Sequence, residues 1–232
     1  MYKKILRVLE IIGPFKGKTA IFLILVIVMA LAEIVGISML LPIIVVTACI
    51  SMYAMKRPEV LNKLMLSPYK VVHHKAYHRI LTHGFIHSDG MHLAINLFVL
   101  WEFGSVVELE YGEGFPFLYF GAIIVASIPA IAKHKNNINY NSLGASGAVS
   151  AVLMAFIVAH PSHTLLLFFI IPIPAILAGV LFFIFERAMQ KRGGTGIAHD
   201  AHIYGAGFGL IYALINDPNG LTNMFSALTG LF

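Results

Sequence analysis

Apolar segments long enough to form membrane helices fill most of this 232-residue chain. Hydrophobic residues make up 59% of the sequence, charged residues only 12%, and the mean hydropathy is +0.85. Soluble domains contain about 25% charged residues, so the composition excludes that class and predicts an all-α membrane bundle. About six or seven helices of about 20 residues fit, with no room for a separate soluble domain. The apolar segments run over 19–41, 42–55, 92–107, 115–132, 146–159, 164–185 and 201–215.

The first two apolar segments are continuous in hydropathy, interrupted only by Glu33, Gly36 and Pro42. They fit two helices or one long kinked helix. The stretch is longer than the roughly 7 to 15 residues of a signal-peptide core, so we expect a retained anchor. The expected organisation is a basic tail and an extra N-terminal hydrophobic helix over 1–37, a membrane domain over 38–216 and a short C-terminal tail over 217–232.

The net charge of +5 comes from Lys and Arg residues that flank the apolar segments. No basic stripe lies on a soluble element, so this distribution favours lipid headgroups over nucleic acid as partners. We expect the polar connection over 57–79 to lie at the membrane interface, with short helices that shield the site. The single Cys49 excludes an internal disulfide.

A Gly-Ala-Ser-Gly motif at 144–147 opens an apolar segment that Pro161 ends. The helix between them has about 14 residues and rises about 21 Å, whereas a hydrocarbon core is about 30 Å thick. The start of this helix, at Ser146, is therefore expected to lie below the membrane surface. The polar run over 136–142 needs protein or water around it, and such water can serve hydrolysis. Unpaired N–H groups at the helix start can stabilise negative charge.

His202 lies near the start of the last apolar segment and is followed by Gly205 and Gly209. This spacing of small residues lets a helix press its backbone against a neighbour, which would bring the imidazole to Ser146. A neutral histidine can take the proton of a serine near pH 7. Ser146 and His202 are thus the candidate nucleophile and general base.

His92 and Asn96 are four residues apart and share one face of a predicted helix. Polar side chains at this depth face the interior of a bundle. There they can stabilise an oxyanion or only tie helices together, and these two residues alone leave both roles open.

These motifs together resemble the rhomboid family of intramembrane serine proteases, over residues 38–216. Their order and spacing carry the resemblance. The matching elements are His87, the run from His92 to Asn96, the end of that helix from Phe103-Gly104 to Glu108, the motif at 144–147, and Ala201-His202 with Gly205 and Gly209.

The resemblance implies a six-helix core that hydrolyses peptide bonds in or near the transmembrane segments of other membrane proteins. It implies no cofactor and no metal, because water, serine and histidine suffice. The location we expect is a bacterial inner (plasma) membrane, crossed several times. The implied roles are nucleophile for Ser146, general base for His202, oxyanion hole for His92, Asn96 and the Ser146 N–H, and support for His83, His87, Gly144, Gly147 and Gly205.

Two positions carry expectations of their own. Ser150 stands where several relatives have a tyrosine that stacks on the base, so the resemblance implies that His202 is held differently here. The segment over 164–185, which contains Pro172 and Pro174, would be the helix that tilts to admit a substrate laterally.

The orientation in the membrane is left open by the basic residues. They lie in the N-terminal tail, the first loop, 133–135 and 187–192. If the extra N-terminal segment spans the membrane, the positive-inside rule turns the catalytic mouth toward the cytoplasm. The family resemblance implies the opposite orientation.

Two other functions remain as alternatives. His83, His87 and His92, with His199 and His202, can be interpreted as histidine boxes of a membrane metalloenzyme that holds zinc or iron. That interpretation has no nearby carboxylates apart from Asp89 and Asp200, and it leaves the serine motif unexplained. The other alternative is a noncatalytic rhomboid-like protein that binds substrates.

Overall fold

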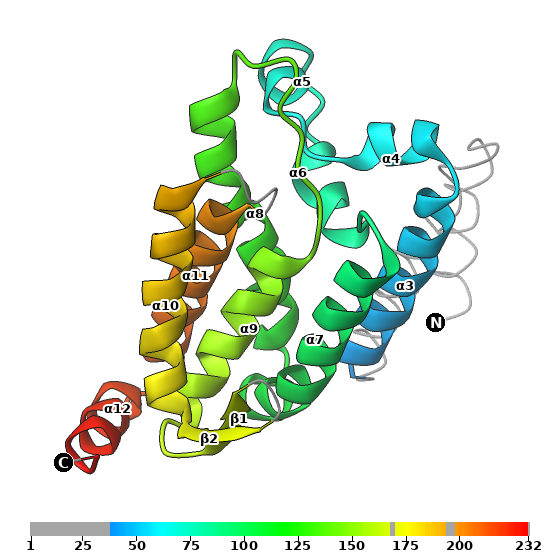
Figure 1. Ribbon diagram of the computed structural model, residues 1–232. Helices are drawn as coiled ribbons and strands as arrows, with labels where there is room; N and C mark the ends of the chain where they lie inside the picture. Colours follow the sequence, from blue (N-terminus) through cyan, green and yellow to red (C-terminus); the bar gives the residue numbers. More distant parts are fainter. Residues whose placement is uncertain (1–37, 168–169, 194–197, 232) are drawn as a thin grey trace.

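The structure is a computed structural model that describes residues 38–167, 170–193 and 198–231. The predicted N-terminal helix over 1–37 lies outside these residues. The described chain is mostly helical (Figure 1). Its elements are α3 (Leu40–Met55), α4 (Pro58–Leu64), α5 (Pro68–His73), α6 (Arg79–Thr82), η1 (His83–Phe85), α7 (Gly90–Tyr111), α8 (Gly114–His134), α9 (Ser146–Ala159), β1 (Thr164–Leu167), β2 (Ile171–Pro174), α10 (Ala175–Arg192), α11 (His199–Asn216) and α12 (Gly220–Thr229).

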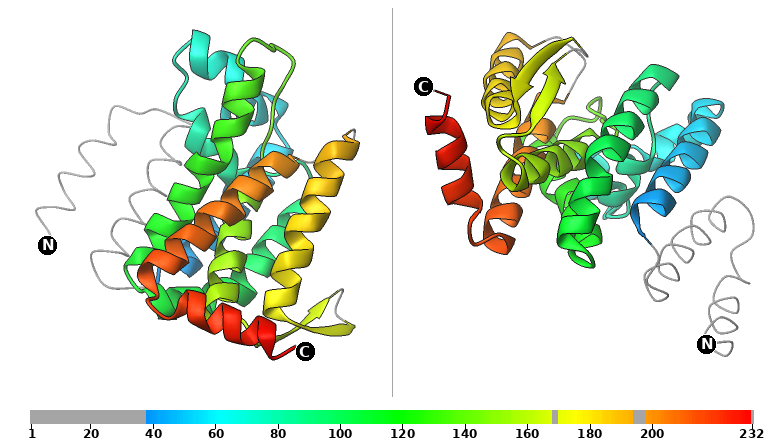
Figure 2. Two further views of the ribbon diagram at one scale, coloured as in Figure 1. Left: turned by 90° about the vertical axis from the view of Figure 1, so that its left-hand side faces the viewer. Right: turned by 90° about the horizontal axis from the view of Figure 1, so that it is seen from below.

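Helix α9 lies at the centre of the assembly, with α3 and α7 on one side and α10 and α11 on the other (Figure 1). Its small side chains, including Ala148, Ala151 and Ala155, are fully buried and let its neighbours approach closely. The helix runs from Ser146 to Ala159, which confirms the predicted length of about 14 residues. Figure 2 shows α12 lying across one end of the assembly, where it contacts α9, α10 and α11.

Two helices of the described residues, α7 and α8, are long and apolar enough to cross a membrane. Helices α3 and α9 are also apolar but shorter, with 16 and 14 residues. On α7, large apolar side chains such as Ile95, Phe98 and Trp101 are exposed. Exposed apolar side chains of this size fit contact with lipid.

The start of α3 is fixed by Glu108, near the end of α7. Its carboxylate accepts hydrogen bonds from the backbone N–H groups of Met39 and Leu40 and from the hydroxyl of Ser38. These N–H groups have no partners within the helix, so an acceptor from a neighbouring helix satisfies them. Helix α3 therefore begins at Leu40, and Pro42 lies in its first turn, where a proline is tolerated.

The predicted short helices in the first connection are confirmed as α4, α5 and α6. Arg79 holds this connection together, because its guanidinium donates to the carbonyls of Asn62 and Met65 at 2.9 and 2.8 Å. The hydroxyl of Thr82 donates to the carbonyl of Leu64 at 2.8 Å. These bonds join the end of the first connection, at α6, to the end of α4.

The prediction of a continuous helix over 164–185 is wrong, whereas the described chain is mostly helical, as expected, apart from one short hairpin. Strands β1 and β2 form an antiparallel hairpin in which Leu165 is paired with Ile173, and α10 begins only at Ala175. Pro172 and Pro174 explain the difference, because prolines this close together cannot continue an α-helix. Both precede α10 and do not bend it.

Candidate functional site

Helix α11 packs its glycine face against the first half of α9. A Cβ atom on Gly205 would lie 2.0 Å from the carbonyl oxygen of Gly147, and one on Gly209 would lie 2.2 Å from that of Ala151. Only glycine fits at such a distance. The predicted close contact between these helices is confirmed. Their first turns, which carry Ser146 and His202, are therefore neighbours.

The hydroxyl of Ser146 and the imidazole of His202 are not joined directly. Across the described part of the chain, the side-chain hydrogen bonds include none between Ser146 and His202 or between Ser146 and Asn96. In enzymes without bound substrate, catalytic hydrogen bonds are often long and tighten only when substrate binds.

The segment between α8 and α9 descends along the assembly, so that α9 begins well below the end of α8 (Figure 1). The backbones of Leu66 and Ser142 bond to each other at 2.9 and 3.0 Å and hold the upper part of this segment. Nearer Ser146, the N–H of Gly144 donates to the carbonyl of His83 at 2.9 Å. These bonds fix the approach to Ser146.

His87 connects three segments at this point. The N–H of Ala145 donates to its Nε2 at 3.3 Å, so Nε2 carries no proton and Nδ1–H donates to the hydroxyl of Ser51 at 2.9 Å. Ser51 in turn donates to the carbonyl of Phe85 at 3.0 Å. Burial lowers the pKa of His87 to about 3, which keeps this neutral form in place. His87 thus anchors the residue that precedes Ser146.

His83 is buried beside α8. Its Nε2 lies 2.9 Å from the hydroxyl of Ser127, which donates to the carbonyl of Ile123 at 2.9 Å, so the imidazole is the donor to Ser127. Burial lowers the pKa of His83 to about 4. His83 and His87 are therefore both neutral hydrogen-bonding groups.

His92 lies against Gly144, two residues before the candidate nucleophile. Gly144 has a φ of +118°, and a Cβ there would stand 2.9 Å from Cε1 of His92. His92 also interacts electrostatically with His202. The buried amide of Asn96 donates to the carbonyl of His92 at 2.8 Å, within the same helix. His92 thus contacts the segment that leads to Ser146, while Asn96 is bonded to its own helix.

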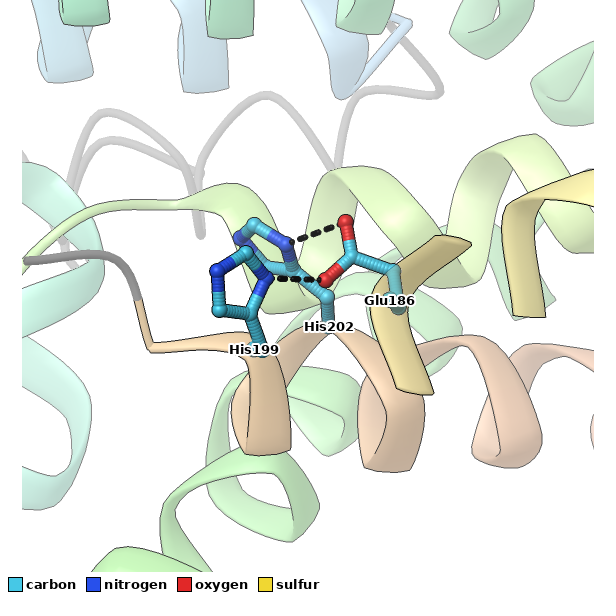
Figure 3. A group of neighbouring side chains, drawn as sticks. All are labelled: Glu186, His199 and His202. Atoms are coloured by element: carbon cyan, nitrogen blue, oxygen red, sulfur yellow. Dashed lines mark hydrogen bonds and ion pairs between the residues drawn. The ribbon is translucent and has the colours of Figure 1, made fainter. Parts of the chain in front are cut away.

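A carboxylate that the sequence analysis missed, Glu186 of α10, contacts the candidate base (Figure 3). Its Oε1 lies 3.1 Å from Nδ1 of His202, and its Oε2 lies 2.7 Å from Nδ1 of His199. Glu186 and His199 are each 6% exposed. A signal was present, because an ionisable residue in an apolar segment is a functional candidate by default. The spacing in sequence gave no hint of the contact with His202.

The histidine boxes of the metalloenzyme alternative do not come together. Within the ranges that the structure describes, one group of possible metal ligands forms, from Glu186, His199 and His202, with ligand atoms within 4.8 Å of one another. His83 and His87 instead bind Ser127 and Ser51. Only His199 and His202 lie together, and the carboxylate of Glu186 between them already accepts from both imidazoles.

Comparison with known proteins shows which family this chain resembles. A model of the rhomboid domain matches residues 74–217, which include all the motifs at His87, His92, Ser146 and His202. The chain is 30% identical to RHOMBOID-like protein 12, mitochondrial, of Arabidopsis thaliana over 145 residues, 56% of this chain and 43% of that protein. It is 32% identical to presenilin-associated rhomboid-like protein, mitochondrial, of Homo sapiens over 133 residues, 55% and 35% of the two chains.

Similarity to Rhomboid protein 1, mitochondrial, of Saccharomyces cerevisiae is 33% identity over 144 residues, 57% of this chain and 40% of that protein. The chain thus spans less than half the length of these curated relatives. Their names also correct the expected location. A bacterial inner membrane is wrong, because these relatives are mitochondrial proteins and point to a mitochondrial membrane.

Proposed function

This chain belongs to the rhomboid family, and on that premise we propose that it is an intramembrane serine endopeptidase. The observation that carries the proposal is the contact of the glycine face of α11 with the start of α9, where Gly205 lies against Gly147. This contact supports a dyad, because it brings together the helix turns that hold Ser146 and His202. We propose a mitochondrial membrane as the location.

The first chemical step is attack by the serine. As Oγ of Ser146 bonds to the scissile carbonyl carbon, its proton passes to Nε2 of His202 and the carbonyl π electrons move to the oxygen. The resulting oxyanion is stabilised by the N–H of Ser146 at the start of α9 and by His92 and Asn96 of α7. The amide of Asn96 has two N–H donors, so one can bond the oxyanion while the other keeps its bond to the carbonyl of His92.

The second step releases the amine. The tetrahedral intermediate collapses, the C–N bond breaks, and the amine leaves with the proton from His202. Water then attacks the acyl carbon while Nε2 of His202 takes its proton, and collapse of this second intermediate breaks the C–Oγ bond, returns the proton to Oγ of Ser146 and releases the new carboxyl terminus. Gly144 lets His92 approach the segment before Ser146, and Gly147 lets α8 and α11 pack closely against the start of α9.

The proposed membrane arrangement uses the helices around α9. We assign the six spans of the protease core to α3, α7, α8, α9, α10 and α11. The substrates are membrane proteins with a transmembrane segment that bends or unwinds near the cut, since a peptide bond within a regular helix is shielded by its own hydrogen bonds.

Labelling of the purified protein with a fluorophosphonate probe tests the proposal. The wild type should be labelled, and Ser146→Ala and His202→Ala should both lose the label. Ser105→Ala, on the far half of α7, is the matched control and should label as the wild type does. Folded wild-type protein that takes no label would contradict an activated serine and favour a noncatalytic substrate-binding role.

A further inference from the structure

We propose that Glu186 is a positioning residue for the base, so that this chain works with a Ser146–His202–Glu186 triad in place of a dyad. The proposal rests on the proposed function and deepens it. Its basis is the juxtaposition drawn in Figure 3, in which one carboxylate of α10 is shared by two imidazoles of α11. Neither the family match nor the sequence motifs assign a role to this residue.

The geometry fixes which nitrogen of His202 is available for catalysis. Nδ1 lies 3.1 Å from Oε1 of Glu186, and an ionised carboxylate can only accept, so Nδ1 carries the proton. In a neutral imidazole the other nitrogen, Nε2, then has a free lone pair. That is the form which a general base needs to take a proton from Ser146.

His199 holds the carboxylate in place. Its Nδ1–H donates to Oε2 of Glu186 at 2.7 Å, so each carboxylate oxygen has its own imidazole donor. The rings of His199 and His202 stand nearly perpendicular, at 81°, with centroids 6.0 Å apart. His199 therefore orients Glu186, and Glu186 orients His202. In this chain Glu186 takes over the role of the tyrosine that several relatives have at the position of Ser150.

The carboxylate of Glu186 stays ionised throughout the reaction. When Nε2 of His202 takes the serine proton, the imidazolium retains Nδ1–H, and the negative charge of Glu186 stabilises the new positive charge. When Nε2 gives that proton to the leaving amine, the original neutral tautomer returns. No proton passes to Glu186, and no other reactant is needed.

The test compares labelling rates of Ser146 in the full chain carrying Glu186→Gln, Glu186→Ala or Glu186→Asp. The amide of Glu186→Gln can donate to Nδ1 of His202 and lock the proton on Nε2, so we expect a loss of about 100-fold or more. Glu186→Ala leaves His202 free to choose its tautomer and should lose less. Glu186→Asp keeps the charge and should retain most of the rate. This order is the signature of tautomer control, since a structural role would make the isosteric Gln the mildest change.

Glu113→Gln, an exposed carboxylate between α7 and α8, is the matched control and should label like the wild type. The dependence of the rate on pH is recorded for each variant. The groups that face His202 are Glu186 of α10, His199 of α11 and His92 of α7, so His92→Gln separates any effect of that neighbour. In variants without the carboxylate, the acid limb of the profile should move, whereas Glu113→Gln should leave it in place.

Two outcomes would overturn the triad. One is a folded variant without the carboxylate, Gln or Ala, that labels within about threefold of the wild type with the same pH profile. The other is loss of wild-type labelling on treatment with 1,10-phenanthroline and its return with Zn²⁺, which would make Glu186, His199 and His202 a metal site. If the wild type takes no label at all, the proposed protease function fails instead, so the two failures are distinguishable.

Discussion

Gly205 of α11 lies directly against the carbonyl group of Gly147 of α9, so that a Cβ on Gly205 would stand 2.0 Å from that oxygen. Gly205→Ala should therefore force the two helices apart and separate Ser146 from His202. We expect a loss of about 1 to 3 kcal/mol in the free energy of unfolding, as in overpacked cores, and near-complete loss of probe labelling. Thermal unfolding and labelling of the detergent-solubilised protein measure both.

The control for this prediction is Gly207 on the same helix, where an added Cβ meets nothing within 4 Å. Gly207→Ala should keep full labelling and gain about 0.5 to 1 kcal/mol from helix propensity. Equal effects of the two substitutions would show that the close contact between α9 and α11 does not position the dyad.

Gly144 combines a backbone and a contact requirement. Its φ of +118° is disfavoured for other residues, and an added Cβ would lie 2.9 Å from Cε1 of His92. Gly144→Ala should displace His92 and the approach to Ser146, lowering the labelling rate by about tenfold or more. Gly112→Ala has φ +51° and open space, so it isolates backbone strain. A similar rate loss at Gly112 would contradict a role for the contact with His92.

Ser51 supports the site from α3 without touching it. Ser51→Ala removes the acceptor for Nδ1–H of His87 and leaves a buried donor without a partner, at a cost of about 1 to 3 kcal/mol. His87 also accepts from the N–H of Ala145, so the loss should slow labelling of Ser146 as well. Unfolding midpoints and labelling rates are measured together. A stable variant with a normal rate would mean that His87 holds its position unaided.

The stability of the fold should decrease as the pH is lowered, because His83 and His87 are buried. The pKa of His83 is about 4 and that of His87 about 3, against 6.5 in the unfolded chain. Below pH 6.5 the unfolded state binds protons that the folded state excludes, so the free energy of unfolding decreases as the pH drops toward these values. For His83 the full loss amounts to about 3 kcal/mol.

Unfolding midpoints recorded from about pH 7.5 to about pH 5 test this, because the effect begins near the unfolded pKa. In His83→Gln the decline should be shallower than in the wild type, since one of the two groups no longer titrates. A decline with the same slope in both proteins would show that His83 is not the source.

Local signals in the sequence were sufficient to predict the central helix, while contacts between distant segments were not. Pro161 and the glycines around Ser146 delimit α9, and the glycines after His202 indicate its contact with α11, because these features act within one or two turns. Hydropathy, in contrast, counts the segment over 164–185 as one apolar run. Pro172 and Pro174 divide it into a hairpin and α10, because a proline restricts the backbone conformation but hardly changes the hydropathy.

Glu186 could not be assigned from the sequence for a similar reason. Its partners, His199 and His202, lie on another helix, and nothing in the spacing says which face of α10 meets α11. The same applies to Glu108, whose role at the start of α3 depends on the antiparallel packing of α3 and α7.

The 16 residues of α3 rise only about 24 Å, less than the thickness of about 30 Å of a hydrocarbon core. As one of the proposed spans, α3 with its exposed apolar face of Leu41, Val45 and Met52 would therefore create a hydrophobic mismatch with the surrounding lipid. We expect activity to fall in reconstituted bilayers of increasing acyl-chain length, and an unchanged rate would contradict this. A substrate helix of ordinary length that enters this compressed lipid ring is too long for it, so the bilayer itself helps to push one end of that helix out of the membrane.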